Sequence, residues 1–366
     1  MLGFENLIIE RSSSLIRIDG SQGEGGGQIL RTSLFFSFVL GREVVVENIR
    51  AKRDNPGLRP QHLAVIKAFE KVTGGQAENA AVGADWVKFS PGHHVEAQLE
   101  VDVGTAGSIT LILQTLLPAL SLRGHSCSVK VRGGTDTRWS PTYGYFKSLY
   151  EPAMTTLGLK FSTRVIRRGY YPAGGGWVEA STGPASLLEA VSFIRGPSQS
   201  TARLVSICSR LPRRVAERQA AAATAVLQRS KIKIEGVEIG VEDAESPGTS
   251  LVVFHTEEDR RCFLGADSIG EKGVTAEEVG RSAAERFCSA MKSGASVDRN
   301  LADMVVPVLA LVGEGEVVTE AATGHLRTNL AVAQAFTGCD YELHEAEGIC
   351  RVHVSKGRPD ATPLKS

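Results

Sequence analysis

Strand-like and helix-like hydrophobic patterns alternate along the first half of the chain. Residues 15–20 alternate apolar and polar positions, as a half-buried strand does, and residues 28–40 carry the apolar spacing of a helix. A strand over residues 43–51 follows, and then a helix that ends at Gly74, since glycine is a common helix stop. The pattern predicts the order strand, helix, strand, helix.

The same order returns further along the chain. Residues 99–120 predict a strand, a glycine-rich turn and a helix, and a second strand and helix follow. Gly23 and Gly104 are 81 residues apart, and Gln61 and Tyr143, early in the two second helices, are 82 apart. Two unrelated positions with nearly the same offset indicate a repeated unit of helices packed on a small sheet.

A third copy is delayed by a segment with a pattern of its own. Residues 190–297 predict several strands, an alanine-rich helix opened by Pro212, and a last helix at Thr275 with Glu278 completing a capping box. The helix–strand–helix pattern resumes after residue 298. We therefore predict an α/β (α+β) protein. Residues 1–189 and 298–366 form a large domain of three repeated units, and residues 190–297 form a smaller inserted α/β domain.

Composition narrows the class of protein. The chain has 366 residues, of which 42% are hydrophobic, and 41 Lys and Arg balance 41 Asp and Glu. A protein that coats a long stretch of phosphates carries a basic excess, so any contact with nucleic acid is expected to be local. The longest apolar run, residues 305–312, is broken by Pro307 and is too short to span a bilayer. We expect no membrane association.

The cysteines and the N-terminus bear on the compartment. Six cysteines are scattered from Cys127 to Cys350 without a Cys-x-x-Cys pair, which favours reduced thiols over a disulfide frame or a zinc site. The first residues hold acids and no long apolar core, unlike a secretory signal. These features predict a cytoplasmic protein.

The glycine run at residues 23–27 contains one carboxylate, Glu24. It matches neither a dinucleotide fingerprint nor a P-loop, because Gln28 replaces the third glycine and no Gly-Lys-Ser/Thr follows. One interpretation is a tight turn with positive φ. The other is bare backbone that admits an anionic ligand to a helix N-terminus. Glu24 would then hold a divalent cation, Mg or Mn, and Arg31 would add a positive charge.

Basic residues gather before the second predicted helix. Arg50, Lys52, Arg53 and Arg59 surround a Pro-Gly turn. They form either a solvated charged loop or a phosphate-binding cluster, for which arginine forks are suited. Gln61 and His62 stand at the helix start, where a histidine is more often a packing or capping residue than a catalyst.

His325 opens the last predicted helix within the stretch GHLRTN. A single histidine is often structural. The functional alternative is a nucleophile, since a neutral imidazole nitrogen attacks phosphorus and later departs as a protonated group. The positive end of a helix would favour nearby phosphates.

The stretch GYYPAGGGW, residues 169–177, joins aromatic residues to a second glycine run. It suits a structural hairpin, and it equally suits a stacking surface for a base. The sequence does not separate these two interpretations.

Taken together, seven blocks resemble the RNA 3′-terminal phosphate cyclase family. They are DGSQGEGGGQILRTSL, RAKRDNPGLRPQH, GTAGSITLILQTLLPAL, RGGTD, YYPAGGGW, LADMVVPVLAL and GHLRTNLAV, in family order from about residue 16 to residue 354. The resemblance implies three repeated units with an inserted domain. It also implies that ATP adenylylates a histidine, that AMP passes to an RNA 3′-phosphate, and that the 2′-hydroxyl closes a 2′,3′-cyclic phosphate.

The resemblance also assigns roles to positions of this sequence. The nucleophile falls on His325 and the metal-associated acid on Glu24. Contacts with phosphate or RNA fall on Arg31, Arg50, Arg53 and Gln61. Contacts with ATP fall on Gln114, Asn300, Leu301, Ala302, Asp303 and Met304. The implied partners are RNA 3′-phosphate ends, and the sequence leaves the oligomeric state open.

This chain departs from the family at the ATP-contacting stretch. Many members have YLADQ or HLADQ where this chain has NLADM, so Asn300 offers no aromatic ring and Met304 no side-chain amide. Residues 1–14 lie outside the resemblance. Two alternatives remain open: a non-catalytic cyclase-like RNA-binding factor in ribosomal RNA processing, and an enolpyruvyl-transferase-like enzyme. The first class lacks the nucleophilic histidine, and the second would bind small anions without ATP.

Overall fold

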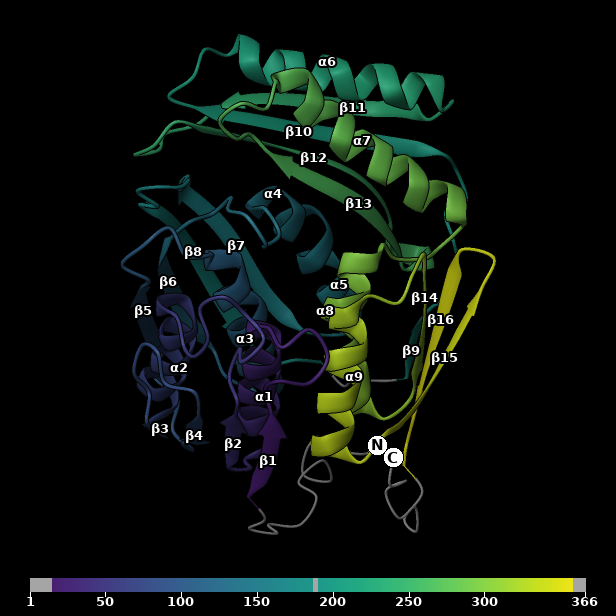
Figure 1. The fold of residues 1–366 in the computed structure, drawn as a ribbon. Helices are drawn as coiled ribbons and strands as arrows, with labels where there is room; N and C mark the ends of the chain where they lie inside the picture. The colour runs from purple at the N-terminus through teal and green to yellow at the C-terminus, as the bar shows by residue number, and fades with distance from the viewer. Residues whose placement is uncertain (1–14, 187–189, 358–366) are drawn as a thin grey trace.

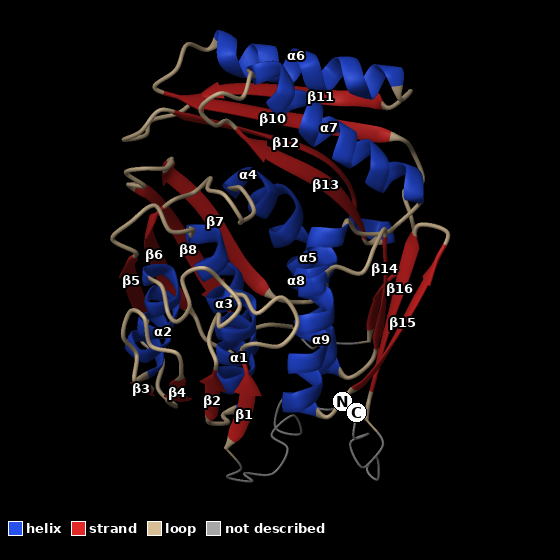
Figure 2. Cartoon of the chain, viewed as in Figure 1, coloured by secondary structure: helices blue, strands red, loops and turns tan. Residues whose placement is uncertain are grey.

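The computed structural model describes residues 15–186 and 190–357, which form four four-stranded sheets (Figure 1, Figure 2). In the first unit, β1 pairs in parallel with β2, and β4 and β3 continue antiparallel in the order β1-β2-β4-β3. Its elements are β1 (Ile16–Asp19), α1 (Gly27–Leu40), β2 (Val44–Glu47), α2 (Pro60–Thr73), β3 (Gln76–Glu78) and β4 (Val87–Ser90).

The second and third units repeat this topology, with one parallel pair followed by two antiparallel pairs. The second consists of β5 (Gln98–Asp102), α3 (Ile109–Leu122), β6 (Cys127–Gly133), α4 (Tyr143–Tyr145), the π-helical turn η2 (Phe146–Tyr150), α5 (Glu151–Thr156), β7 (Lys160–Arg167) and β8 (Gly176–Gly183). The third consists of β9 (Val191–Phe193), α8 (Arg299–Val312), β14 (Gly315–Thr319), α9 (Gly324–Thr337), β15 (Asp340–Ala346) and β16 (Ile349–Ser355). The predicted α+β fold of three repeated units is confirmed.

The fourth sheet has a different strand order and lies at one end of the molecule (Figure 1). Its strands run β11-β10-β12-β13, and α6 and α7 pack together on it. Thr275 and Glu278 form the predicted capping box at the start of α7. The elements are β10 (Thr201–Ser209), α6 (Arg214–Arg229), β11 (Lys233–Val241), β12 (Gly248–Glu257), η3 (Glu258–Arg260), β13 (Cys262–Ile269) and α7 (Ala276–Ser293).

Strand β9 shows where the fourth sheet interrupts the repeats. It falls at the beginning of the range 190–297 that we assigned to the inserted domain, yet it pairs with β14 of the third sheet, Val191 opposite Gly315. The chain therefore enters the third unit before the interruption. The insertion replaces the turn between the first strand and the first helix, which is glycine-rich in the other two units. The division at residues 190 and 297 stays a prediction.

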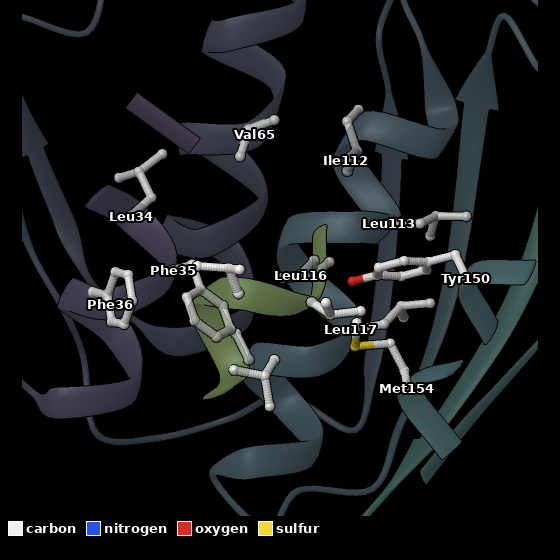
Figure 3. Close-up of a cluster of buried hydrophobic side chains, with 14 of the residues drawn as sticks. Leu34, Phe35, Phe36, Val65, Ile112, Leu113, Leu116, Leu117, Tyr150 and Met154 are labelled. Atoms are coloured by element: carbon white, nitrogen blue, oxygen red, sulfur yellow. The ribbon is translucent and has the colours of Figure 1, made fainter. Parts of the chain in front are cut away.

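Helices from the three units meet in one apolar core (Figure 3). Phe36 of α1, Leu116 of α3 and Leu309 of α8 are all fully buried. Burial of such side chains contributes about 1.5–3 kcal/mol each. The fourth sheet has a second core, which includes Leu204 and Phe287. The large core therefore fixes α1, α3, α8 and α9 relative to one another.

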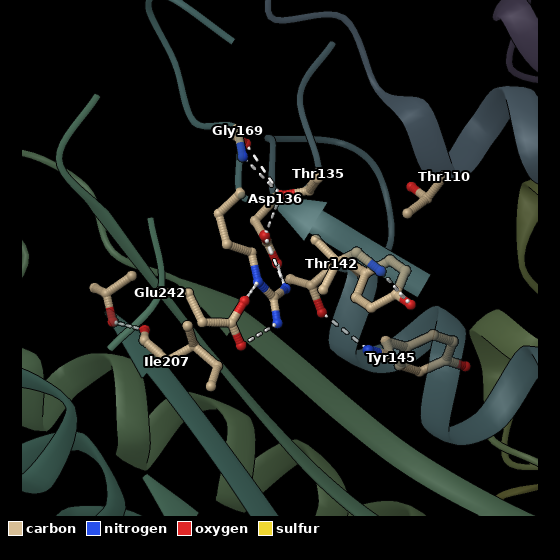
Figure 4. A network of polar contacts seen from close by, with 12 residues as sticks. Thr110, Thr135, Asp136, Thr142, Tyr145, Gly169, Ile207 and Glu242 are labelled. Carbon is tan, nitrogen blue, oxygen red and sulfur yellow. Dashed lines mark hydrogen bonds and ion pairs between the residues drawn. The ribbon is translucent and has the colours of Figure 1, made fainter. Parts of the chain in front are cut away.

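A buried ion-pair network joins the second unit to the fourth sheet (Figure 4). Arg168 Nε donates to Glu242 Oε2 at 2.7 Å, and its Nη1 donates to Asp136 Oδ2 at 3.2 Å. Its guanidinium also stacks over the Tyr143 ring, 5.2 Å from the centroid. Removal of one partner from a buried pair leaves an uncompensated charge, so this network holds the junction in one arrangement.

The cysteines and the apolar character of the helices bear on the predicted compartment. All six cysteines are unpaired. Across residues 15–186 and 190–357, none of the helices has the length and the apolar character to cross a membrane. The cytoplasmic location stays a prediction.

The glycine-rich stretch at residues 169–177 forms a turn between β7 and β8. Tyr170 is buried and bridges to Gly174, while Tyr171 is 80% exposed. The hairpin interpretation is therefore correct, and the exposed Tyr171 ring leaves the stacking interpretation open.

Candidate active site

The glycine run between β1 and α1 lies against the start of α9. Gly23 has φ +54°, and a Cβ there would lie 2.3 Å from Thr328 Oγ1. On the facing helix, a Cβ at Gly324 would lie 2.3 Å from Glu24 Oε1. The run therefore supplies the positive φ of a tight turn and also lets two segments of the chain approach closely. Its role in admitting an anionic ligand stays a prediction.

This approach brings Glu24 and His325 together. Glu24 Oε2 lies 3.2 Å from His325 Nδ1, and the two side chains are 42% and 44% exposed. Nδ1 is itself buried and has no aligned hydrogen-bond partner. The exposed part of the imidazole therefore consists of ring atoms other than Nδ1.

The position of His325 makes its imidazole neutral. It lies in the first turn of α9, one residue after Gly324, and Thr323 caps the helix by accepting from Leu326 N at 2.9 Å. Burial lowers the pKa of His325; the Glu24 carboxylate opposes this shift, and Arg31 and Arg53 add to it. A neutral imidazole at neutral pH retains a nucleophilic lone pair.

His62 lies in the first turn of α2, and its ring packs against the start of α1. Its Nδ1 accepts a hydrogen bond from Arg59 N at 3.1 Å, so it caps α2, as we expected of a histidine at a helix start. Burial, with Arg31, Arg50 and Arg59 nearby, lowers the pKa of His62 to about 3. The ring is therefore neutral with its proton on Nε2. A Cβ at Gly27 would lie 2.1 Å from that Nε2, so the ring touches the backbone that opens α1.

The arginines before α2 lie in different surroundings: Arg50 bonds to its own loop, whereas Arg53 lies beside the glycine run. Arg50 donates to Asn55 O and folds into its own loop. Burial, with Arg59 and Arg53 nearby, lowers its pKa. Arg53 is exposed, and its Nη2 lies beside Gly26, where a Cβ would be 3.3 Å away. Over the described part of the chain, neither these two residues nor Arg31 forms an ion pair with a carboxylate. Such unpaired guanidiniums suit an anionic ligand.

Gln61 lies where the first unit meets the second. It is half-buried at the start of α2, and a Cβ at Gly107 would lie 3.1 Å from Gln61 Cβ. Gly107 belongs to the glycine-rich turn before α3. Gln61 therefore contacts the turn that corresponds to the glycine run of the first unit.

A small pocket brings together three of the predicted residues, Arg31, Gln114 and Met304, at the meeting point of α1, α3 and α8. Burial lowers the pKa of Arg31 to about 10, which leaves it cationic at neutral pH. Gln114 Oε1 is buried and has no hydrogen-bond partner. The pocket is lined by Gln28, Arg31, Thr32, Phe35, Gln114, Thr115, Pro118, Tyr150, Met304, Pro307, Val308 and Asn329.

The residues predicted to contact ATP, 300–304, lie on the first turns of α8 and differ in their exposure. Leu301 and Ala302 are wholly buried in the large core, and Asn300 is exposed on the first turn of α8. Asp303 accepts a hydrogen bond from Thr323 Oγ1 at 2.5 Å. Burial, with Asp298 and Glu24 adding to it, raises the pKa of Asp303 to about 8.

Glu24 is the residue that suits a divalent cation. Among the described residues, no group of three or more His, Cys, Asp or Glu side chains could hold a metal. Mg²⁺ is commonly bound by one or two carboxylates together with substrate phosphates, and the half-exposed Glu24 carboxylate fits that mode. A cation here would take its remaining ligands from a phosphate-bearing substrate and from water.

Sequence reasoning missed the polar residues that hold the site together. They are Gln28, Thr32 and Asn329, which form one hydrogen-bond network. The spacing of Gln28, Thr32 and Phe35 on one helix face was the available signal for the first two. The contact from α9 had no local signal.

Fold and site together define an α+β protein of repeated units with arginines that form no ion pair near a histidine of lowered pKa. The family model for RNA 3′-terminal phosphate cyclase matches residues 22–343. The chain is 42% identical over 342 residues to the RNA 3′-terminal phosphate cyclase of Pyrococcus furiosus, covering 91% of this chain and 96% of that protein. The protein of the same name from Methanopyrus kandleri is 39% identical over 341 residues, with 92% and 97% covered. The chain belongs to the RNA 3′-terminal phosphate cyclase family.

Proposed function

We propose that this protein uses ATP to convert an RNA 3′-terminal phosphate into a 2′,3′-cyclic phosphate, through AMP covalently bound to His325. The observation that carries the proposal is the neutral imidazole of His325, half-exposed beside Glu24 and next to unpaired arginines. Membership of the cyclase family supports the reaction class.

The first step forms the bond between His325 and AMP. With its proton on Nδ1, near Glu24 Oε2, the imidazole has its lone pair on Nε2. Nε2 attacks the α-phosphorus of ATP, the bond to the β-phosphate oxygen breaks, and pyrophosphate leaves. Arg31 and Arg53 place positive charge where phosphate charge builds up. A divalent cation, held by Glu24 and the phosphates, would offset the charge of the leaving pyrophosphate.

The next two steps use the activated phosphate. An oxygen of the RNA 3′-phosphate attacks the phosphorus on His325, the P–N bond breaks, and AMP moves to the RNA end. The terminal 2′-oxygen then attacks the 3′-phosphorus, the ring closes, and AMP leaves. The site needs to hold only one terminal phosphate, which agrees with a zero net charge and a local arginine cluster.

Incubation with ATP labelled in its α-phosphate tests the proposal directly. The wild-type protein is expected to acquire one AMP per chain in the presence of Mg or Mn. Intact mass measurement identifies the adduct. A protein that acquires no AMP under these conditions would support the non-catalytic alternative.

Replacement of Glu24 by alanine is expected to slow AMP uptake by about a hundredfold, because both the metal site and the group facing Nδ1 are lost. More divalent cation should restore part of the rate. The measurement is the initial rate of labelling against cation concentration. Glu342→Ala, which removes the carboxylate of an exposed His–Glu pair elsewhere, is the control. Full activity of Glu24→Ala at limiting cation would contradict the assignment.

The lowered pKa of His325 predicts a pH profile. Protonation removes the lone pair on Nε2, so AMP uptake falls in acid. Because the folded pKa lies below the usual 6.5, the fall should occur below that pH. Glu24 raises this pKa, so Glu24→Gln should move the fall to still lower pH. Labelling rates from about pH 5 to about pH 8, each normalised to its plateau, provide the comparison. A shift towards higher pH in Glu24→Gln would contradict this prediction.

A further inference from the structure

Asn329 satisfies a backbone carbonyl that a proline leaves free. Pro307 lies inside α8 and has no N–H, so the carbonyl of Asp303, one turn earlier, lacks its helical donor. Asn329 Nδ2 donates to that carbonyl oxygen at 2.6 Å. A carbonyl can only accept, so the amide nitrogen of Asn329 must face it. The fully buried Asn329 thereby joins α9 to the part of α8 that carries Asp303.

The oxygen end of the same amide faces α1. Asn329 Oδ1 accepts from Thr32 Oγ1 at 2.7 Å and from Gln28 Nε2 at 3.2 Å. Gln28 Oε1 in turn accepts from Arg31 Nη2 at 2.8 Å. Two hydrogen bonds in series therefore link Asn329 to the guanidinium of Arg31. Asn329 itself lies one turn after His325 on α9.

The second unit also has a proline inside a helix that leaves a carbonyl free, but a different side chain satisfies that carbonyl. Pro118 lies inside α3, and the freed carbonyl of Gln114 accepts from the Tyr150 hydroxyl at 3.0 Å. A hydroxyl is enough for that task. At the position of Asn329, one side chain must donate to a carbonyl and also accept from two donors. A carboxamide donates and accepts through separate atoms, so its nitrogen faces the Asp303 carbonyl of α8 while its oxygen faces the two donors of α1.

We propose that Asn329 is a positioning residue that sets the Arg31 guanidinium relative to Asp303 and His325. This inference rests on the proposed function, because it concerns the same site. Asn329 lies on α9 with His325, and it contacts two further elements that carry predicted site residues: α1 with Arg31 and α8 with Asp303. Its role is to act through Gln28 and to leave the substrate untouched.

The consequence for the reaction follows from geometry. A guanidinium matches a phosphate only in a defined orientation. Without its hydrogen bond to an oriented Gln28, Arg31 retains its charge but is no longer held in that orientation. Small misplacements of groups around a reacting phosphate cost large factors in rate. Loss of Asn329 should therefore resemble loss of the aligned Arg31, although Asn329 itself carries no charge.

A double-mutant cycle tests this coupling. Asn329→Leu should slow AMP uptake about tenfold. Arg31→Lys keeps the charge and loses the fork that Gln28 orients. In the Arg31→Lys background, Asn329→Leu should cost no more than about twofold, because the group it positions is already gone. A purely structural role would give the full tenfold loss in both backgrounds and would overturn the proposal.

Further variants protect the test against misfolding. Gln28→Leu breaks the same series of bonds from a half-buried position, and it should reproduce the Asn329→Leu loss. Wild-type labelling by Gln28→Leu would overturn the proposal. Ser206→Ala is the control: it removes buried hydrogen bonds of the fourth sheet and should leave labelling unchanged.

A binding measurement separates failure of this inference from failure of the proposed function. Calorimetric titration with ATP gives a second cycle that requires no covalent transfer. If the wild-type protein binds ATP and acquires no AMP, the proposed reaction fails. In that case the ATP affinities of the wild type, Asn329→Leu, Arg31→Lys and the double variant decide whether Asn329 and Arg31 are coupled. Non-additive losses of affinity support the role of Asn329, and additive losses reject it.

Discussion

His325→Ala is expected to acquire no AMP from ATP, with a rate loss of at least about 10⁴-fold. The nucleophile forms the covalent bond itself, so neither Glu24 nor the arginines can replace it. The fold should survive, because the His325 side chain is 44% exposed and its Nδ1 has no aligned hydrogen-bond partner to lose. The measurement is intact mass after incubation with ATP and a divalent cation, together with the melting temperature of the variant.

A matched control exists on β15. His344 Nε2 lies 3.1 Å from Glu342 Oε2, so this exposed pair resembles His325 and Glu24 in type and distance. His344→Ala should therefore label like the wild type. If His325→Ala labels as well as the wild type, the nucleophile is another residue, and His62 is the next histidine to replace.

The same experiment bears on the two alternatives left by the sequence. A non-catalytic cyclase-like factor would show no adduct in any variant. An enolpyruvyl-transferase-like enzyme would bind small anions and would need no ATP. Membership of the cyclase family favours the cyclase reaction over the enolpyruvyl-transferase-like alternative, and the labelling experiment separates it from the non-catalytic one.

Much of the fold could be predicted from the sequence because its signals are local. The glycine that ends α2, Gly74, has φ +68°, as a helix stop requires. The capping box of Thr275 and Glu278 depends on residues three positions apart. Strand β9 was missed because it has three residues and its partner β14 lies beyond the whole fourth sheet. Pairing over such a distance leaves no periodic trace near either strand.

The candidate site likewise depends on long-range contacts that leave no local signal in the sequence. The stretches that hold Glu24, Arg53 and His325 could be selected from their motifs, and the resemblance joined them. Their contact depends on two glycine approaches, at Gly23 and Gly324, that only the packed structure reveals. Pro307 was noted as an interruption of an apolar run. That it frees a carbonyl for Asn329 follows from the position of α9, which no local pattern specifies.

The second large effect concerns the RNA end. An oligonucleotide that ends in a 3′-phosphate with a 2′-hydroxyl should give a 2′,3′-cyclic phosphate and release AMP. The same oligonucleotide with a terminal 2′-deoxyribose should stop as the adenylylated end. The measurement is product mass and AMP release from both substrates. A third oligonucleotide, ending in a 3′-hydroxyl, is the control and should not react.

The contrast should be nearly complete because the ribose itself supplies the attacking group. The 2′-oxygen is held next to the activated phosphorus, and such intramolecular attack has effective molarities of roughly 10⁵ M or more. The protein then needs only to align the end and neutralise charge, tasks that suit unpaired guanidiniums such as Arg53 beside the glycine run. Without the 2′-oxygen, only water remains as a nucleophile, and AMP stays on the end. Equal products from the ribose and deoxyribose ends would exclude cyclisation. Reaction of the 3′-hydroxyl end would point instead to a ligase-like transfer.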